Sequence, residues 1–258
     1  MDAQLQALLQ AGDLPGLQAL LRESSDFFLR DAQDATLLHW AARFGQVSII
    51  EWLLEKGLSL NDRDQNGETP LHYAVRGGQE EAVRLLLSKG ADPNARSLTG
   101  SRPLHLAAHA GFLSIAKVLC EAGASVDAPN ENGSTPLHLA VYNGHLALAD
   151  YMIERGASIH AGTAKGAQAI HWAAISGNVE MVRFLLSKGA NPNAQDREGH
   201  TPLQEAAARG YLPIVQLLVE QGADINLADA RGQTPLYLAE KRWHTEVAEW
   251  LREKGAEE

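Results

Sequence analysis

The chain has 258 residues, of which 45% are hydrophobic and 21% are charged, a composition typical of globular proteins and not of disordered ones. Its formal net charge of −10 repels phosphate and argues against nucleic acid and anionic membranes as general partners. The single cysteine, Cys120, excludes an intramolecular disulfide, and no apolar run approaches the ~18 residues that a membrane span needs.

The N-terminal segment predicts a helix pair and not a targeting signal. Asp2 stands where a signal peptide would carry Lys or Arg, so we expect a cytoplasmic protein. Leucines at helical spacing over residues 3–23 predict two short helices, and the glutamines between them predict a polar end that faces solvent.

From residue 36 onward, one four-residue word recurs every 33 residues. Its copies are TLLH at 36–39, TPLH at 69–72, RPLH at 102–105, TPLH at 135–138, QAIH at 168–171, TPLQ at 201–204 and TPLY at 234–237. Two sets of glycines keep the same period, one after each word and one at the end of the apolar stretch that follows. This regularity predicts an array of one repeated structural unit.

Each copy reads as a tight hairpin followed by two short helices. In the second copy, residues 64–67 predict the hairpin turn, and Pro70 opens a helix because its missing N–H is not needed in the first turn. A second helix is predicted over about 80–88, and Gly90 supplies the left-handed conformation that ends it. A helix pair this short cannot bury its own apolar face, so neighbouring copies must stack on one another.

The patterns D-x-x-G-x-T-P-L-H-x-A-A-x-x-G and L-L-x-x-G-A-x-x-N resemble the ankyrin repeat family over essentially the whole chain. The resemblance implies an all-α solenoid of L-shaped units, each a helix pair with a β-hairpin finger at roughly a right angle. It implies a curved, elongated stack, with the first helices and the hairpins on the concave side. We divide this single domain (1–258) into an N-terminal capping repeat at 1–30, internal repeats at 31–63, 64–96, 97–129, 130–162, 163–195 and 196–228, and a C-terminal capping repeat at 229–258.

Several copies depart from the pattern. Asp34 stands where the hairpin glycine belongs, Arg102 replaces the Thr of the repeated word, and Trp243 replaces the glycine that ends the first helix. The segment 162–171 lacks the hairpin Asp, the Thr and the Pro together, so we expect either a hinge or a specialised contact there. A small-ligand or catalytic site near this segment is an alternative that the sequence leaves open.

The histidines of the repeated word are predicted to be buried and to form hydrogen bonds across units. They are His39, His72, His105, His138 and His171. Packed helices lie ~8–10 Å apart, so equivalent histidines cannot share a metal ion whose ligand nitrogens lie ~2.1 Å from it. Cys120 occupies a position that other copies fill with Leu or Ile, so we expect a buried hydrophobe. No nucleotide-binding, metalloprotease or hydrolase motif appears, and we predict no enzymatic activity, no cofactor and no metal.

An asparagine recurs after the Gly-Ala that closes each unit, and we expect its side chain to bond the hairpin backbone. In the family that the chain resembles, such asparagines can be hydroxylated by an oxygenase. The resemblance therefore makes Asn94, Asn193 and Asn226 candidate hydroxylation sites, and the protein would then be the substrate of an asparaginyl hydroxylase.

The positions that the repeat leaves free predict the binding surface, because the framework residues are occupied in holding the stack. Besides the hairpin tips, these positions lie on the exposed side of the first helices and are rich in the aromatic and arginine side chains of binding hot spots. They are Trp40, Arg43, Phe44, Tyr73, Arg76, His109, Tyr142, Asn143, Trp172, Ile175 and Arg209. For Trp40, Tyr73 and Trp172, covering the neighbouring unit is an equally good interpretation. We expect a monomeric scaffold or adaptor that binds a protein or an extended peptide.

Overall fold

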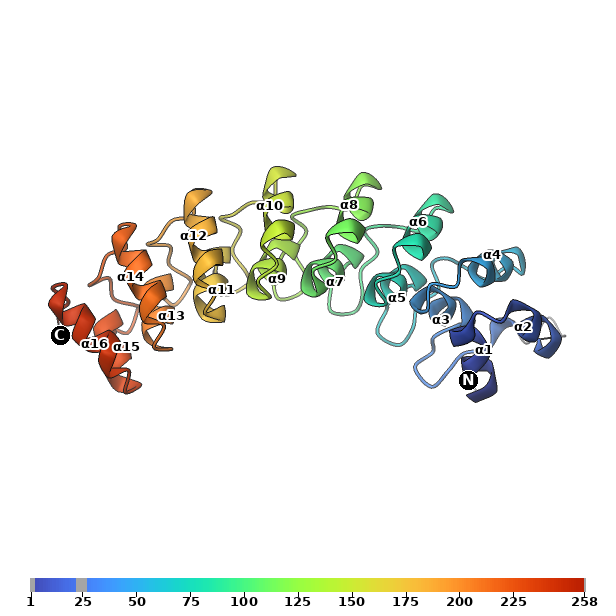
Figure 1. Cartoon of the computed structure of the whole chain (residues 1–258), viewed down its shortest axis with the longest axis horizontal. Helices are drawn as coiled ribbons and strands as arrows, with labels where there is room; N and C mark the ends of the chain where they lie inside the picture. The colour runs from blue at the N-terminus through green and yellow to red at the C-terminus, as the bar shows by residue number, and fades with distance from the viewer. Residues whose placement is uncertain (1–2, 22–26, 258) are drawn as a thin grey trace. The chain divides into compact units, whose positions relative to one another are not determined.

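The computed structural model describes residues 3–21 and 27–257, which form sixteen helices in two compact units, 1–125 and 126–258 (Figure 1). Residues 1–2 and 22–26 of the predicted N-terminal cap, and Glu258 of the C-terminal cap, lie outside the described residues. Strand pairing in the described part of the chain is limited to one antiparallel bridge, between Arg30 and Thr36. The predicted all-α class is confirmed.

Both units consist of helix pairs that follow one another in chain order (Figure 1). Unit 1 contains α1 (Ala3–Ala11), α2 (Leu14–Leu20), α3 (Leu37–Arg43), α4 (Val47–Glu55), α5 (Pro70–Arg76), α6 (Glu80–Ser88), α7 (Pro103–Ala110) and α8 (Leu113–Glu121). Unit 2 contains α9 (Pro136–Tyr142), α10 (Leu146–Glu154), α11 (Ala169–Ser176), α12 (Val179–Ser187), α13 (Pro202–Ala207), α14 (Leu212–Glu220), α15 (Pro235–Lys241) and α16 (Thr245–Glu253).

The first helix of a repeat begins and ends where the sequence predicts. In α5, Thr69 is the extended N-cap residue, Pro70 is the first helical residue, and the backbone N–H of Thr69 donates to Nδ1 of His72 at 3.1 Å. Gly78 follows the helix with a φ of 70°, in the left-handed region that favours glycine. The side chains on the inner side of α5 are small, and Ala74 and Val75 are fully buried. Adjacent first helices such as α3 and α5 can therefore pack closely.

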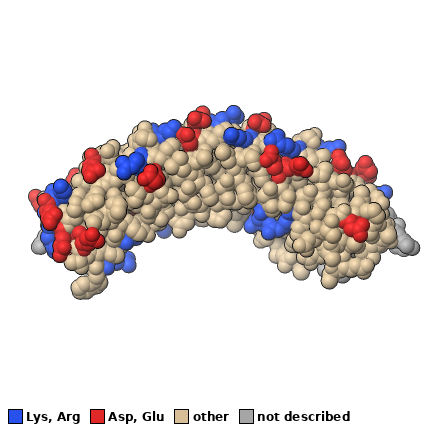
Figure 2. All heavy atoms as spheres, viewed as in Figure 1, with Lys and Arg blue, Asp and Glu red and all other residues tan. Residues whose placement is uncertain are grey.

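The second helices are amphipathic. In α6 the buried residues are Ala82, Val83 and Leu86, whereas Leu87 is only half-buried. On the outer side, the guanidinium of Arg84 pairs with Glu80 at 2.7 Å. Figure 2 shows acidic and basic side chains mixed along the edge that carries the second helices, as expected for a solvated face.

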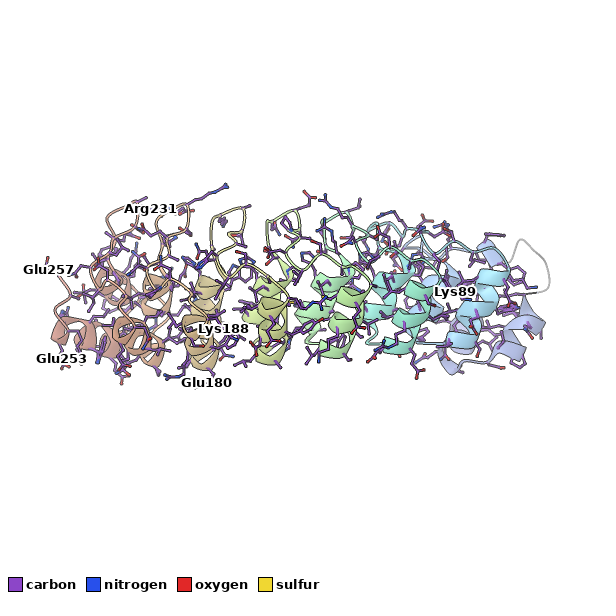
Figure 3. The ribbon with its side chains drawn as sticks, turned by 90° about the horizontal axis from the view of Figure 1, so that it is seen from above. Lys89, Glu180, Lys188, Arg231, Glu253 and Glu257 are labelled. Atoms are coloured by element: carbon purple, nitrogen blue, oxygen red, sulfur yellow. The ribbon has the colours of Figure 1, made fainter. Side chains whose placement is uncertain are left out.

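The predicted hairpin fingers are closed by turns and not by strand ladders. In the finger at 64–68, the N–H of Asp64 donates to the carbonyl of Glu68 at 3.0 Å, and the Asp64 carboxylate accepts from the N–H groups of Asn66 and Glu68. Neighbouring fingers are joined by single backbone bonds, such as that from the N–H of Leu98 to the carbonyl of Asn66. In both units the fingers project to one side of the helices (Figure 3).

The irregular segment 162–171 keeps the backbone of this turn. The N–H of Thr163 donates to Ala167 at 3.0 Å, the N–H of Gly166 donates to Thr163 at 2.7 Å, and the N–H of Arg197 in the next finger donates to Lys165 at 2.8 Å. Thr163 occupies the place of the hairpin Asp, whose carboxylate in other copies accepts two backbone N–H groups. A hinge or a specialised contact in this segment stays a prediction.

The two irregular positions Asp34 and Trp243 are the described non-glycine residues with positive φ, at 64° and 63°. Each therefore adopts the left-handed conformation of the glycine that it replaces, which is energetically unfavourable for a residue that has a Cβ atom. No helix in the described ranges is long and apolar enough to cross a membrane.

Candidate partner-binding face

The framework beneath the first helices is a ladder of buried histidines, as predicted. In each case one ring nitrogen accepts the N–H of its own N-cap residue, so the other nitrogen carries the proton and donates to a carbonyl 29 residues further on. These bonds are His39 to Glu68 (3.1 Å), His72 to Ser101 (3.3 Å), His138 to Ala167 (3.2 Å) and His171 to His200 (3.0 Å). The predicted hydrogen bonds between neighbouring repeats are confirmed for these four residues.

Burial keeps these histidines neutral. Desolvation lowers the pKa of His72 and of His138 to about 4, and it lowers the pKa of His39 and His171 in the same direction. In the described residues, no group of three or more His, Cys, Asp or Glu side chains could hold a metal ion. Cys120 is buried, as predicted.

The recurring asparagines bond the next repeat and not the hairpin, so that prediction is wrong. Asn94 donates to the carbonyl of Gly123 at 2.9 Å and accepts the N–H of Ser125 at 2.8 Å. Asn193 repeats this pattern with Gly222 and Asp224, and Asn226 accepts the N–H of Glu257. The amide reaches forward to the turn that ends the next second helix, because stacking places that turn directly beside it. Hydroxylation of Asn94, Asn193 or Asn226 stays a prediction.

In unit 1, the predicted face divides into supporting and exposed aromatics. The indole of Trp40 donates to Asp31 at 2.7 Å, and the hydroxyl of Tyr73 donates to Asp64 at 3.0 Å. The rings of Trp40 and Tyr73 pack edge to face with their centroids 5.8 Å apart, and the Tyr73 residue is only 9% exposed. Tyr73 therefore offers little surface to a partner and instead supports Trp40, beside which Phe44 lies half-buried.

The two candidate binding arginines of unit 1, Arg43 and Arg76, are the last residues of α3 and α5. Arg76 is exposed and pairs with Glu68, whose pKa is raised because burial desolvates its carboxylate. The Nη1 atom of Arg43 is buried and has no hydrogen-bond partner. His109 is exposed at the end of α7.

In unit 2, the predicted face centres on Tyr142, which is 46% exposed at the end of α9. Its ring meets that of Trp172 edge to face at 5.5 Å, and the half-buried Trp172 also contacts His138. Asn143 beside Tyr142 is exposed, and Ile175 at the end of α11 is half-buried. The contact between Tyr142 and Trp172 therefore joins candidates from two adjacent first helices, α9 and α11.

A basic hollow that the sequence reasoning did not single out lies further along unit 2. It measures about 440 Å³. Its lining is His200, Gln204, Glu205, Ala208, Arg209, Arg231, Gln233, Leu238, Lys241 and Arg242. Of these residues, only Arg209 belongs to the face predicted from the sequence, which did not include α15, the first helix of the last repeat. The run Lys241-Arg242-Trp243, at positions that the repeat leaves free, was the signal.

Helix pairs in register, joined by forward hydrogen bonds from one repeat to the next, define a repeat protein. A family model described as ankyrin repeats in three copies matches residues 5–97, 96–163 and 170–258. The chain therefore belongs to the ankyrin repeat family, whose repeats are generally protein–protein interaction modules and typically non-catalytic. A search of curated proteins gave no match.

Proposed function

We propose that this protein is a non-enzymatic scaffold that binds a protein or an extended peptide through its first helices and the adjoining finger tips. The observation that carries the proposal is the contrast between framework and free positions. The framework side chains are buried and bonded from repeat to repeat, as His138 is to Ala167. Tyr142, one turn beyond His138 on the same helix, is exposed and aromatic, and its ring contacts another candidate residue, Trp172.

The rigid support of these side chains favours binding. Trp40 and Tyr73 are held by hydrogen bonds to the carboxylates of their own fingers, and Trp172 contacts two rings of the preceding first helix, α9. Because these side chains are already ordered, little conformational entropy is lost when a partner binds, and such preorganisation raises affinity.

Affinity capture from the native cell tests the proposal. The double variant Phe44→Ala with Tyr142→Ala should lose captured proteins that the unaltered chain retains. The matched control removes two equally apolar side chains outside the first helices, Phe28→Ala with Leu146→Ala, at positions 57% and 40% exposed. Capture of the same proteins by the Phe44/Tyr142 variant would refute this face, as would equal loss from both variants.

We further propose that the scaffold is monomeric and cytoplasmic. Reduced Cys120, the one cysteine of the sequence, is compatible with a reducing compartment, and the acidic net charge opposes self-association. Sedimentation velocity and cell fractionation test the two statements separately.

A further inference from the structure

The basic hollow of unit 2 is built by two consecutive repeats. One wall comes from α13 and the residues just after it, which contribute Gln204 and Arg209. The other comes from the last finger and α15, which contribute Arg231 and Lys241. In Figure 3, Arg231 lies at the finger edge of unit 2, opposite the edge that carries Glu180 and Glu253.

The charge of this hollow opposes that of the chain. Four of its lining side chains are cations, namely Arg209, Arg231, Lys241 and Arg242, in a protein of formal net charge −10. In the described part of the chain, carboxylates pair with two of them. Glu205 pairs with Arg209, and Glu198 lies 3.3 Å from Arg231.

These pairs leave positive charge available. The Arg231–Glu198 pair is largely exposed, so it contributes little and a ligand carboxylate can replace Glu198. The ammonium group of Lys241 lies 5.2 Å from the ring of Tyr237, a contact that leaves its hydrogen-bond donors available. Four cations against one lining carboxylate, Glu205, give the hollow an excess of positive charge, which attracts ligands of negative charge.

The walls of the hollow are held in place before any ligand arrives. The amide of Gln204 donates to the carbonyl of Gln233 at 2.5 Å and thereby joins α13 to the last finger. The ring nitrogens of His200 lie 3.4 Å from carboxylate oxygens of Asp196 and Asp229, which belong to consecutive fingers. A preformed site loses less entropy when it binds.

The aromatic residue that follows these cations in the chain lines a second, neighbouring hollow with Glu240 and Arg252. Trp243 directly follows Arg242, is 89% exposed, and keeps a φ of 63°. In earlier repeats the residue in this place is a glycine, and the next repeat packs over it, as Phe112 does over Gly78. Trp243 therefore retains a strained backbone without burial to offset it, and strain of this kind gathers at functional sites.

We propose that this hollow binds an acidic segment of a partner protein, whose carboxylates pair with Arg231, Lys241 and Arg242. The proposal rests on the scaffold function proposed above and names the chemistry of the partner. A volume of about 440 Å³ lies within the range of ordinary ligand sites, and it suits a few side chains of an extended peptide.

Fluorescence polarisation with a labelled glutamate-rich octapeptide tests the proposal, with the glutamine analogue as the uncharged probe. The unaltered protein should bind the acidic peptide and not its analogue, and the affinity should fall as salt is raised. The triple variant Arg231→Gln, Lys241→Gln and Arg242→Gln should bind at least ~10-fold more weakly, because it loses three of the four lining cations.

The matched control makes the same change in net charge on the second helices, with Arg84→Gln, Lys117→Gln and Arg183→Gln. Its affinity should stay within ~2-fold of the unaltered protein, since these residues belong to the second helices α6, α8 and α12 and none of them lines the hollow. Equal weakening in both triple variants, or unchanged binding in the first, would overturn the proposal. Binding of inorganic phosphate or of an oligonucleotide in the absence of peptide binding would also overturn it.

Hydrogen exchange on the unaltered protein gives a measure that does not depend on how the variants fold. The peptide should protect backbone amides in 200–209 and 231–243, and protection confined to other segments would count against the hollow. Failure here is distinguishable from failure of the scaffold function. If cellular partners still require Phe44 and Tyr142 while the acidic peptide does not bind, the scaffold stands and this inference falls.

Discussion

The Nε2 atom of His72 lies 3.3 Å from the carbonyl oxygen of Ser101, to which it donates across the boundary between two repeats. Its Nδ1 atom accepts the N–H of Thr69, so a single fully buried ring caps its own helix and ties that helix to the next finger. The bond from Thr69 requires the neutral ring, because a protonated Nδ1 cannot accept a hydrogen bond, whereas Nε2 donates to Ser101 in either charge state.

Acid should therefore destabilise the fold through the buried histidines. The pKa of His72 and of His138 is lowered from 6.5 to about 4 in the folded chain, so between these values the unfolded state binds a proton that the native state does not. Stability is complete above pH 6.5 and falls as the pH drops toward 4, by up to roughly 3 kcal/mol for each histidine. Urea unfolding at pH 7.5, 6, 5 and 4.5 measures this loss.

Glutamine provides the control for this prediction, because Gln204 already occupies the histidine position of its own repeat. Its oxygen accepts the N–H of Thr201 at 2.7 Å, and its amide donates to Gln233. In the double variant His72→Gln with His138→Gln, the free energy of unfolding at pH 7.5 should stay within about 1 kcal/mol per site of the unaltered value. On acidification, this free energy should fall less than it does in the unaltered chain. An acid response equal to that of the unaltered chain would assign the effect to other groups.

Substitution of two hairpin glycines by alanine distinguishes the cost of a left-handed backbone from the cost of a steric clash. Gly133 and Gly232 have φ values of 72° and 73°, but a Cβ on Gly133 would lie 2.4 Å from the backbone nitrogen of Ala164, whereas nothing lies within 4 Å of a Cβ on Gly232. Gly232→Ala should cost about 1 kcal/mol from strain alone. Gly133→Ala should cost a further 1–3 kcal/mol or so, because the neighbouring finger must move. Equal shifts in thermal midpoint would show that the stacked fingers separate without cost.

Glycine at position 243 should stabilise the protein. Trp243 holds a left-handed backbone and gains almost no burial, so Trp243→Gly should raise stability by about 1 kcal/mol. Trp243→Ala removes the indole but keeps the strain, and it should change the thermal midpoint little. Destabilisation by Trp243→Gly would show that the indole packs against its own repeat more strongly than its exposure indicates.

The asparagine bridge should contribute to the coupling between repeats. Asn193→Ala removes the bonds to Gly222 and Asp224 and should cost about 1–2 kcal/mol. Asn193→Asp keeps the acceptor and should cost less, since Asp127 naturally accepts the N–H of Ser158 at 3.1 Å in the same role. Unfolding midpoints of the two variants would rank them, and the opposite order would contradict this assignment.

Much of this protein could be predicted from the sequence because its repeat is local and periodic. The position of Pro70 and of Gly90 fixed the bounds of α5 and α6, and the spacing of the repeated word predicted both the stacking and the buried histidines. Helix ends and turns depend on neighbouring residues in the chain, so these features follow from short-range chemistry.

Tertiary structure decided which side chains remain available to a partner. Tyr73 and Tyr142 occupy free positions of their repeats, yet Tyr73 is buried under Trp40 and bonded to Asp64, whereas Tyr142 is exposed. The forward bonds of Asn94 and the gathering of Arg209, Arg231 and Lys241 around one hollow also join segments from different repeats. Periodicity specifies that repeats stack, but exposure and charge at a given point depend on what the adjacent repeat places there, and that is a property of the packed array.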